Sequence, residues 1–99
     1  MKKGTLLIEA ERERQIIQEG YSLEHDLDND SEELAIVGAL YALPANLREG
    51  ENYLLIDDFY PETWHKRHWK PTPDDRIKEL VKAGALIAAE IDRLQQITK

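Results

Sequence analysis

The stretch LAIVGALYAL, from Leu34 to Leu43, constrains the fold of this chain more than any other segment. All ten residues are apolar or glycine, so a helix here has no face left for solvent and must be surrounded by protein. The preceding DSEEL offers Asp30 as a cap for the free helix amides, with Glu33 three residues later, and Pro44 ends the pattern. These signals predict a buried helix over residues 31–43.

Two further helices are predicted on either side of it. Strong helix formers fill residues 5–19, and Gly20 follows as a stop. Thr72 as a cap and Pro73 at the first helical position predict a helix over residues 73–96. Its apolar residues recur at alternating three- and four-residue spacing, which is typical of the seam between paired helices: Ile77, Leu80, Gly84, Ile87, Ile91 and Leu94.

The middle of this last helix is apolar on its other sides too, so two helices of a 99-residue chain must be surrounded. A monomer of this size has few atoms left to cover both of them, and we therefore predict a homodimer or a larger oligomer that assembles through these two helices. The similar segments VGALYA and AGALIA each carry a glycine, Gly38 and Gly84, and we expect helices to cross there.

Residues 45–72 lack a helical period and contain both tryptophans. Loops of this length are uncommon in compact domains unless they are functional or disordered, and the aromatic side chains favour ordered packing. We predict a long ordered loop with one helical turn near Trp64. The fold expected is thus all-α, a single domain over residues 1–99 with three main helices.

Composition excludes several classes of function. A net charge of −7 argues against DNA binding, which depends on lysine and arginine. The absence of cysteine excludes disulfides and thiol chemistry. The longest apolar run is about half of a membrane span, and the apolar run after the basic start stops at Glu9, before a signal-peptide core is complete. We expect a cytoplasmic protein without membrane contact.

The acidic turn GYSLEHDLDNDSEEL raises the question of a metal site. Its alternate aspartates resemble a calcium loop, but Ser31 stands where that loop needs glycine and Val37 where it needs glutamate. A magnesium site is less demanding, and its candidate ligands are Glu24, Asp26, Glu33 and Glu90. The alternative is that arginines neutralise the buried carboxylates, and the candidates are Arg12, Arg14, Arg76 and Arg93.

The segment WHKRHWK contains the one local cluster of positive charge. Lys66, Arg67 and Lys70 lie between two tryptophans, a combination that can hold a phosphate or stack on a base. Alternatively, the segment folds over the acidic turn and compensates its charge. His65 and His68 are three residues apart and could contribute to a transition-metal site, although a basic aromatic surface explains them equally well.

The blocks ERERQ, EGYSLEHD, EELA, YAL, WKP and LVKAGALIAAEIDRL occur in an order that resembles a widespread family of small uncharacterised phage and prophage proteins. This resemblance covers nearly the whole chain and implies a viral origin and the host cytosol. Members of the family have a tryptophan-rich segment, and the corresponding segment of this chain, PETWHKRHWKP, departs from that pattern. A looser likeness connects the chain to the MazG-type all-α nucleoside triphosphate pyrophosphohydrolases, whose pattern would place a glutamate near Val37 and an aspartate at Arg93.

From these observations we expect a phage-encoded accessory protein that binds a nucleotide-like small molecule or a host protein, with a possible counter-defence role. We expect no catalysis and either no cofactor or Mg²⁺; the alternative is a magnesium-dependent MazG-like pyrophosphohydrolase. Arginines and Lys70 would contact an anion, Trp69 would stack, and the EHD tripeptide would hydrogen-bond or bind metal. The predicted ligand-binding residues are Arg12, Arg14, Gln15, Tyr21, Glu24, His25, Asp26, Trp69 and Lys70.

Overall fold

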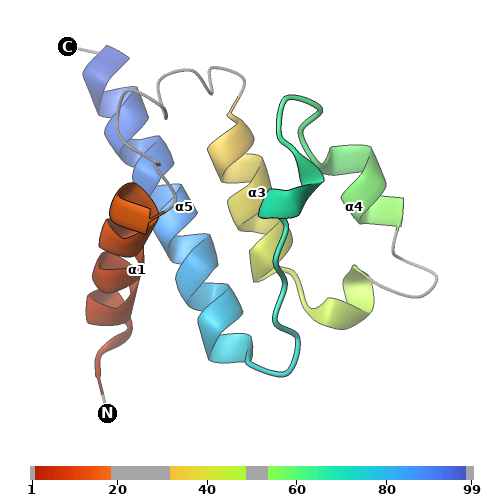
Figure 1. Cartoon of the computed structure of the whole chain (residues 1–99), viewed down its shortest axis with the longest axis horizontal. Helices are drawn as coiled ribbons and strands as arrows, with labels where there is room; N and C mark the ends of the chain where they lie inside the picture. The colour runs from red at the N-terminus through yellow and green to blue at the C-terminus, as the bar shows by residue number, and fades with distance from the viewer. Residues whose placement is uncertain (1, 19–31, 49–53, 98–99) are drawn as a thin grey trace.

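Three long helices form the body of the protein (Figure 1). The computed structural model describes residues 2–18, 32–48 and 54–97, and within these ranges it contains helices and no strand. The long helices are α1 (Gly4–Gln18), α3 (Glu33–Ala42) and α5 (Arg76–Ile97). The prediction of an all-α fold with three main helices is therefore confirmed. Within the same ranges, no helix is long and apolar enough to cross a membrane.

Helix α3 packs along α5, and the core lies mainly between these two helices. Leu34, Val37 and Leu40 are almost completely buried. At Gly38 the backbones come close, because a Cβ placed there would lie 3.2 Å from the carbonyl oxygen of Ala83. The predicted crossing at Gly38 is thus found, and the all-apolar sequence of α3 is explained by its central position.

Helix α1 packs on a different side of α5. The side chain of Ile8 lies over Gly84, where an added Cβ would meet Ile8 Cδ1 at 2.5 Å. Gly84 therefore marks a helix crossing too, but with α1 as the partner. Only Arg12 and Gln15 of α1 are buried, so this helix contacts the core through two polar side chains and a few partly covered aliphatic ones.

Two helix starts lie later than the sequence predicts. Helix α3 begins at Glu33, after Glu32 in a left-handed conformation with φ of 63°; the predicted cap, Asp30, lies outside the described residues. Helix α5 begins at Arg76, because Thr72 forms a turn in which the Asp75 amide donates to its carbonyl oxygen. Asp75 takes the capping role instead, since its Oδ1 accepts a hydrogen bond from the Lys78 amide at 3.1 Å.

The segment expected to be a loop without helical period contains a short helix, α4 (Leu54–Phe59). Two single 3₁₀ turns accompany it, η1 (Ala45–Leu47) and η3 (Lys66–His68), and the second lies close to the turn expected near Trp64. A six-residue helix offers fewer than two turns of periodicity. It is therefore hard to recognise from spacing alone.

A buried ion cluster joins the end of α3 to the start of α5. Arg48 Nη2 donates to Glu79 Oε2 at 2.6 Å, and Arg76 Nη1 donates to Glu79 Oε1 at 3.0 Å. The same arginines donate to the last carbonyl oxygens of α3, those of Leu40, Tyr41 and Ala42, and to that of Leu43, which follows the helix. They satisfy acceptors that every helix end leaves unpaired, and so they fix the position of the chain that enters α5.

Candidate functional site: a cationic pocket between α1 and the aromatic loop

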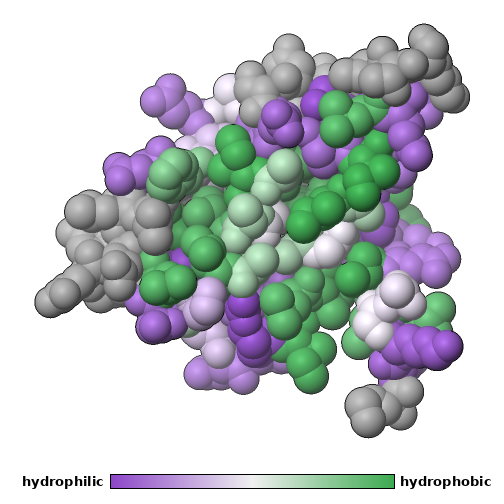
Figure 2. All heavy atoms as spheres, turned by 180° about the vertical axis from the view of Figure 1, so that it is seen from behind, coloured by the Kyte–Doolittle hydropathy of each residue, from purple (hydrophilic) through white to green (hydrophobic). Residues whose placement is uncertain are grey.

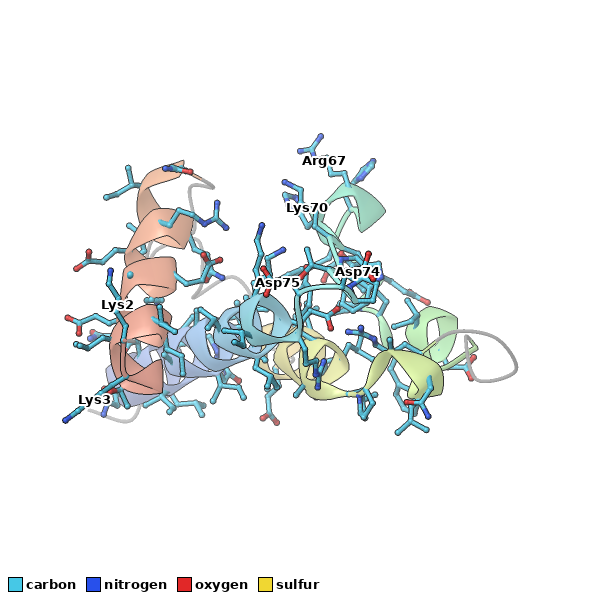
Figure 3. The ribbon with its side chains drawn as sticks, turned by 90° about the horizontal axis from the view of Figure 1, so that it is seen from below. Lys2, Lys3, Arg67, Lys70, Asp74 and Asp75 are labelled. Carbon is cyan, nitrogen blue, oxygen red and sulfur yellow. The ribbon has the colours of Figure 1, made fainter. Side chains whose placement is uncertain are left out.

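A pocket opens on the side of the molecule where α1 and the aromatic loop both project beyond α3 and α5. Figure 3 views this arrangement from below, with α1 on one side and the loop that carries Arg67 and Lys70 on the other. The pocket has a small cavity volume of about 30 Å³, and the space around it, including open solvent at the mouth, amounts to about 380 Å³. Its lining residues are Glu11, Arg14, Gln15, Val37, Tyr41, Trp64, His68, Lys70, Lys82 and Leu86.

The α1 wall of the pocket is polar. Arg14 donates to both carboxylate oxygens of Glu11, each at 2.8 Å, and Gln15 Nε2 donates to Glu11 Oε2 at 3.2 Å. Burial alone would raise the pKa of Glu11, but the hydrogen bonds and charge of Arg14 outweigh it and hold the pKa below its usual value. Gln15 is only 4% exposed, and its Oε1 has no hydrogen-bond partner. An unpaired buried acceptor is costly and calls for a donor.

Lys82 supplies a buried positive charge from α5. It is 9% exposed, and its Nζ donates to the carbonyl oxygen of Lys70 at 2.8 Å and lies 5.5 Å from the centre of the Tyr41 ring. Within the part of the chain that the structure describes, no carboxylate forms an ion pair with it. Burial, together with the charge of Lys78, lowers the pKa of Lys82. The charge of Glu11 opposes this shift without outweighing it, so the ammonium group is only partly compensated.

Tyr41 connects the floor of the pocket to the loop. Its hydroxyl donates to the carbonyl oxygen of His68 at 3.2 Å and accepts from the amide of Lys70 at 2.9 Å. Burial raises the pKa of Tyr41, so the phenol stays neutral and able to donate. This pair of hydrogen bonds anchors the backbone on both sides of Trp69 to helix α3.

The aromatic rings of the loop divide into a supporting group and a lining group. Trp69 packs against Tyr41, with ring centroids 4.5 Å apart, and against Tyr60 at 6.2 Å. Trp64 and His68, with centroids 6.3 Å apart, line the pocket. Trp69 therefore supports the loop from behind, while Trp64 and His68 are placed where a planar ligand would meet them.

The structure brings together three of the predicted ligand-binding residues, Arg14, Gln15 and Lys70. Arg12 points elsewhere, with its Nε 3.8 Å from Asp92 Oδ2 on α5, and Trp69 is not among the lining residues. The remaining predicted residues lie outside the described residues: Tyr21, Glu24, His25 and Asp26.

The acidic residues considered for a metal have other partners where they are described. Arg93 donates twice to the carboxylate of Glu90, at 2.5 and 3.1 Å, and both residues are buried on α5. Glu33 Oε2 accepts a hydrogen bond from the Thr63 hydroxyl at 3.1 Å. Over the described ranges, no group of three His, Asp or Glu side chains is arranged to hold a metal; Glu24 and Asp26 fall outside them. Of the two alternatives considered for Glu90, a metal ligand or the partner of an arginine, the structure shows the arginine partner.

Sequence reasoning missed Lys82, Tyr41 and Glu11. Lys82 stands two residues after Leu80 of the apolar stripe, so it projects to nearly the opposite side of the helix. The sequence does contain a sign of its burial, because Lys82 lies on the same side of the helix as Leu86 and Ala89, which are both buried. Tyr41 was hidden in the apolar run, although its hydroxyl requires a polar partner when buried.

The chain matches no family model, no curated protein and no solved structure. Its class is therefore defined by the fold and the pocket: a small all-α protein in which two helices form a floor and a third helix and an aromatic loop form the walls of a cationic pocket.

Proposed function

We propose that the protein binds a small anionic molecule with a planar, hydrogen-bond-donating group, a nucleotide-like ligand, in the pocket between α1 and the loop. One observation carries the proposal: among the described residues, the buried Lys82 forms no ion pair with a carboxylate and the buried Gln15 Oε1 accepts no hydrogen bond, and both residues line the same pocket. Lys82 requires an anion, whereas Gln15 Oε1 requires a hydrogen-bond donor. A ligand that carries both an anionic group and an N–H or O–H group meets both requirements.

The charge of the pocket supports an anionic ligand. Among the described lining residues, three are cationic, Arg14, Lys70 and Lys82, and one is a carboxylate, Glu11, although the whole chain carries a net charge of −7. Charges interact more strongly where water is excluded, so a phosphate beside Lys82 gains more than it would at an exposed lysine. The local excess of positive charge would attract an anion to this part of an otherwise acidic chain.

The other lining groups support a planar donor. An anion that offers only acceptor oxygens leaves Gln15 Oε1 unpaired, whereas a nucleobase or sugar supplies the missing donor. Trp64 and His68 provide rings for stacking against a base. Because the cavity itself measures only about 30 Å³, we expect a single small group of the ligand to enter while most of it lies in the open mouth.

A binding titration tests this proposal. Nucleosides, nucleoside mono-, di- and triphosphates and inorganic phosphate are titrated into the protein while tryptophan fluorescence and heat are recorded. We expect a nucleotide to bind more tightly than either the nucleoside or phosphate. Lys82→Met, which keeps the aliphatic stem, should weaken binding by about 10-fold to 100-fold, because a charge-assisted hydrogen bond contributes roughly 1.5–3 kcal/mol.

Lys78→Met is the matched control, since Lys78 is an exposed lysine one turn earlier on the same helix. Lys78 does not line the pocket and acts on Lys82 only through charge repulsion, so its removal should leave the affinity within about twofold of the wild type, in keeping with the small effect of exposed charges. Equal affinities of the two variants, with native circular dichroism for both, would contradict the proposal, as would the absence of binding across the panel.

The same panel of nucleotides distinguishes simple binding from the alternative function, that of a magnesium-dependent pyrophosphohydrolase. With Mg²⁺ present, release of pyrophosphate that is abolished by Glu33→Gln or Glu90→Gln would favour the enzyme. The partners of these two carboxylates, Thr63 and Arg93, give it no specific support. A phage-encoded accessory role and a host-protein partner remain part of the proposal, and if no small molecule binds, a pull-down from host lysate becomes the next experiment.

A further inference from the structure

The side of α5 that faces away from the pocket carries a row of exposed aliphatic side chains. Figure 2, which views the molecule from behind, shows an extended apolar surface on this side. The exposed fractions are 68% for Ile77, 47% for Leu80, 43% for Ile87, 51% for Ile91 and 39% for Leu94. Single exposed leucines are normal on a protein surface, but a row of five along one helix marks an interaction surface.

This row and the pocket occupy nearly opposite sides of α5. Lys82, which lines the pocket, follows Leu80 of the row by two residues, a rotation of about 200° around the helix. The surface is therefore separate from the proposed ligand site. The five side chains stay exposed although both neighbouring helices border the row: Ile8 of α1 covers Gly84, and Ile87 lies close to Gly38 of α3.

The spacing of the row is the same in both chain directions. With Gly84 included, the steps between successive positions from Ile77 to Leu94 are three, four, three, four and three residues. A second copy related by a two-fold axis would run antiparallel and place Ile77 opposite Leu94 and Leu80 opposite Ile91. Such a contact uses the same surface on both partners, as a two-fold dimer requires, and alternating three- and four-residue spacing suits helices that cross at about 20°.

We infer that this apolar face of α5 is the docking surface for a second copy of the chain, with the two α5 helices antiparallel. The row contains no charged residue, so two copies of this acidic protein meet there without like charges in contact. At Gly84 the side chain of Ile8 lies over the helix, so α1 borders the centre of the proposed contact with an aliphatic side chain.

Cysteine cross-linking tests both the contact and its direction, because the chain has no cysteine of its own. Ile77→Cys and Leu94→Cys are prepared separately, mixed and oxidised, and the products are weighed by mass spectrometry. We expect the mixed dimer to dominate. Neither variant should cross-link to itself, since equivalent positions would lie about 25 Å apart along the helices, far beyond disulfide reach.

Light scattering supplies the second measurement. The wild-type protein should have the mass of a dimer, and Leu80→Glu, which places a charge in the row, should shift it to a monomer with unchanged helical circular dichroism. Glu62→Cys, at an exposed position outside α5, is the control for random oxidation. A monomeric wild type, self-linked products as abundant as the mixed one, or a dimer that persists in Leu80→Glu would each overturn the inference.

Discussion

Glu79 is the residue whose loss should damage the fold most. Its side chain is 0% exposed and lies between Arg48, itself 2% exposed, and Arg76. Burial would raise the pKa of Glu79, but the hydrogen bonds from the two arginines outweigh it and hold the pKa below its usual value. The carboxylate is thus charged at neutral pH, and the stability it contributes is lost as the pH falls through this lowered pKa.

Glu79→Gln should lower the free energy of unfolding by about 3–5 kcal/mol, because it leaves the charge of Arg48 buried without compensation. Urea denaturation followed by circular dichroism measures the change. Glu62→Gln removes an exposed carboxylate and should shift the free energy by less than about 0.5 kcal/mol. A similar loss in the two variants would show that the buried cluster does not carry the stability assigned to it.

Ionisation of Tyr60 should destabilise the folded protein at alkaline pH. Burial, and to a lesser extent Tyr41, raises the pKa of Tyr60 from 10.0 to about 12, and its hydroxyl donates to the carbonyl oxygen of His65. Between these two pH values the unfolded chain has released the proton and the folded chain has kept it. The free energy of unfolding should therefore fall as the pH rises from 10 to 12, by about 2 kcal/mol in total.

Denaturation curves at pH 9, 10, 11 and 12 measure this loss. Tyr60→Phe removes the ionisable group and should lose less stability over the same interval. Wild-type and Tyr60→Phe curves that decline in parallel would mean that another group causes the alkaline transition.

At the residue scale, the sequence predicted only part of the site. Arg14, Gln15 and Lys70 were identified because clustered polar and cationic residues stand out in a chain of this composition. Lys82 was not, since helix phase shows which residues share a side and leaves open which side faces a pocket. That choice depends on where α1 and the loop come to lie, and these contacts are distant in sequence.

At the scale of elements, the long helices were predictable and the irregular parts were not. The ten apolar residues of α3 and the periodic stripe of α5 extend over several turns, so their signals accumulate. The start of α5 was misplaced because Thr72 and Asp75 are both residues that cap helices well. In the structure Asp75 is the cap, and the Thr72 amide donates a hydrogen bond to the buried carboxylate of Glu79 instead. Helix α4 is too short for its period to be visible.

Gly38 should tolerate no large side chain, because the carbonyl oxygen of Ala83 and Ile87 Cγ1 each lie 3.2 Å from the position of its missing Cβ. Gly38→Val should lower the free energy of unfolding by about 1–3 kcal/mol through overpacking, despite the intrinsic cost of glycine in a helix. Thermal denaturation checks this. Gly4→Val is the control, since no neighbouring atom lies within 4 Å of a Cβ there, and a wild-type melting temperature for Gly38→Val would contradict the close crossing.

For the whole molecule, the proposed pairing through α5 would make stability depend on protein concentration. Folded dimers are favoured by mass action, so the melting temperature should rise over a hundredfold increase in concentration. Leu80→Glu should melt at one temperature throughout the series. A wild-type melting temperature that is independent of concentration would speak against the dimer.

The weak attachment of α1 has a consequence for dynamics. This helix forms one wall of the pocket, yet only Arg12 and Gln15 of its fifteen residues are buried. Elements with few buried contacts open at lower free energy than the core, so amide hydrogen exchange in α1 should be faster than in α3 and α5. A ligand held by Arg14 and Gln15 would bind only the form in which α1 is packed against α5, and it would slow hydrogen exchange selectively in α1. Exchange in this helix would therefore indicate whether the pocket is occupied.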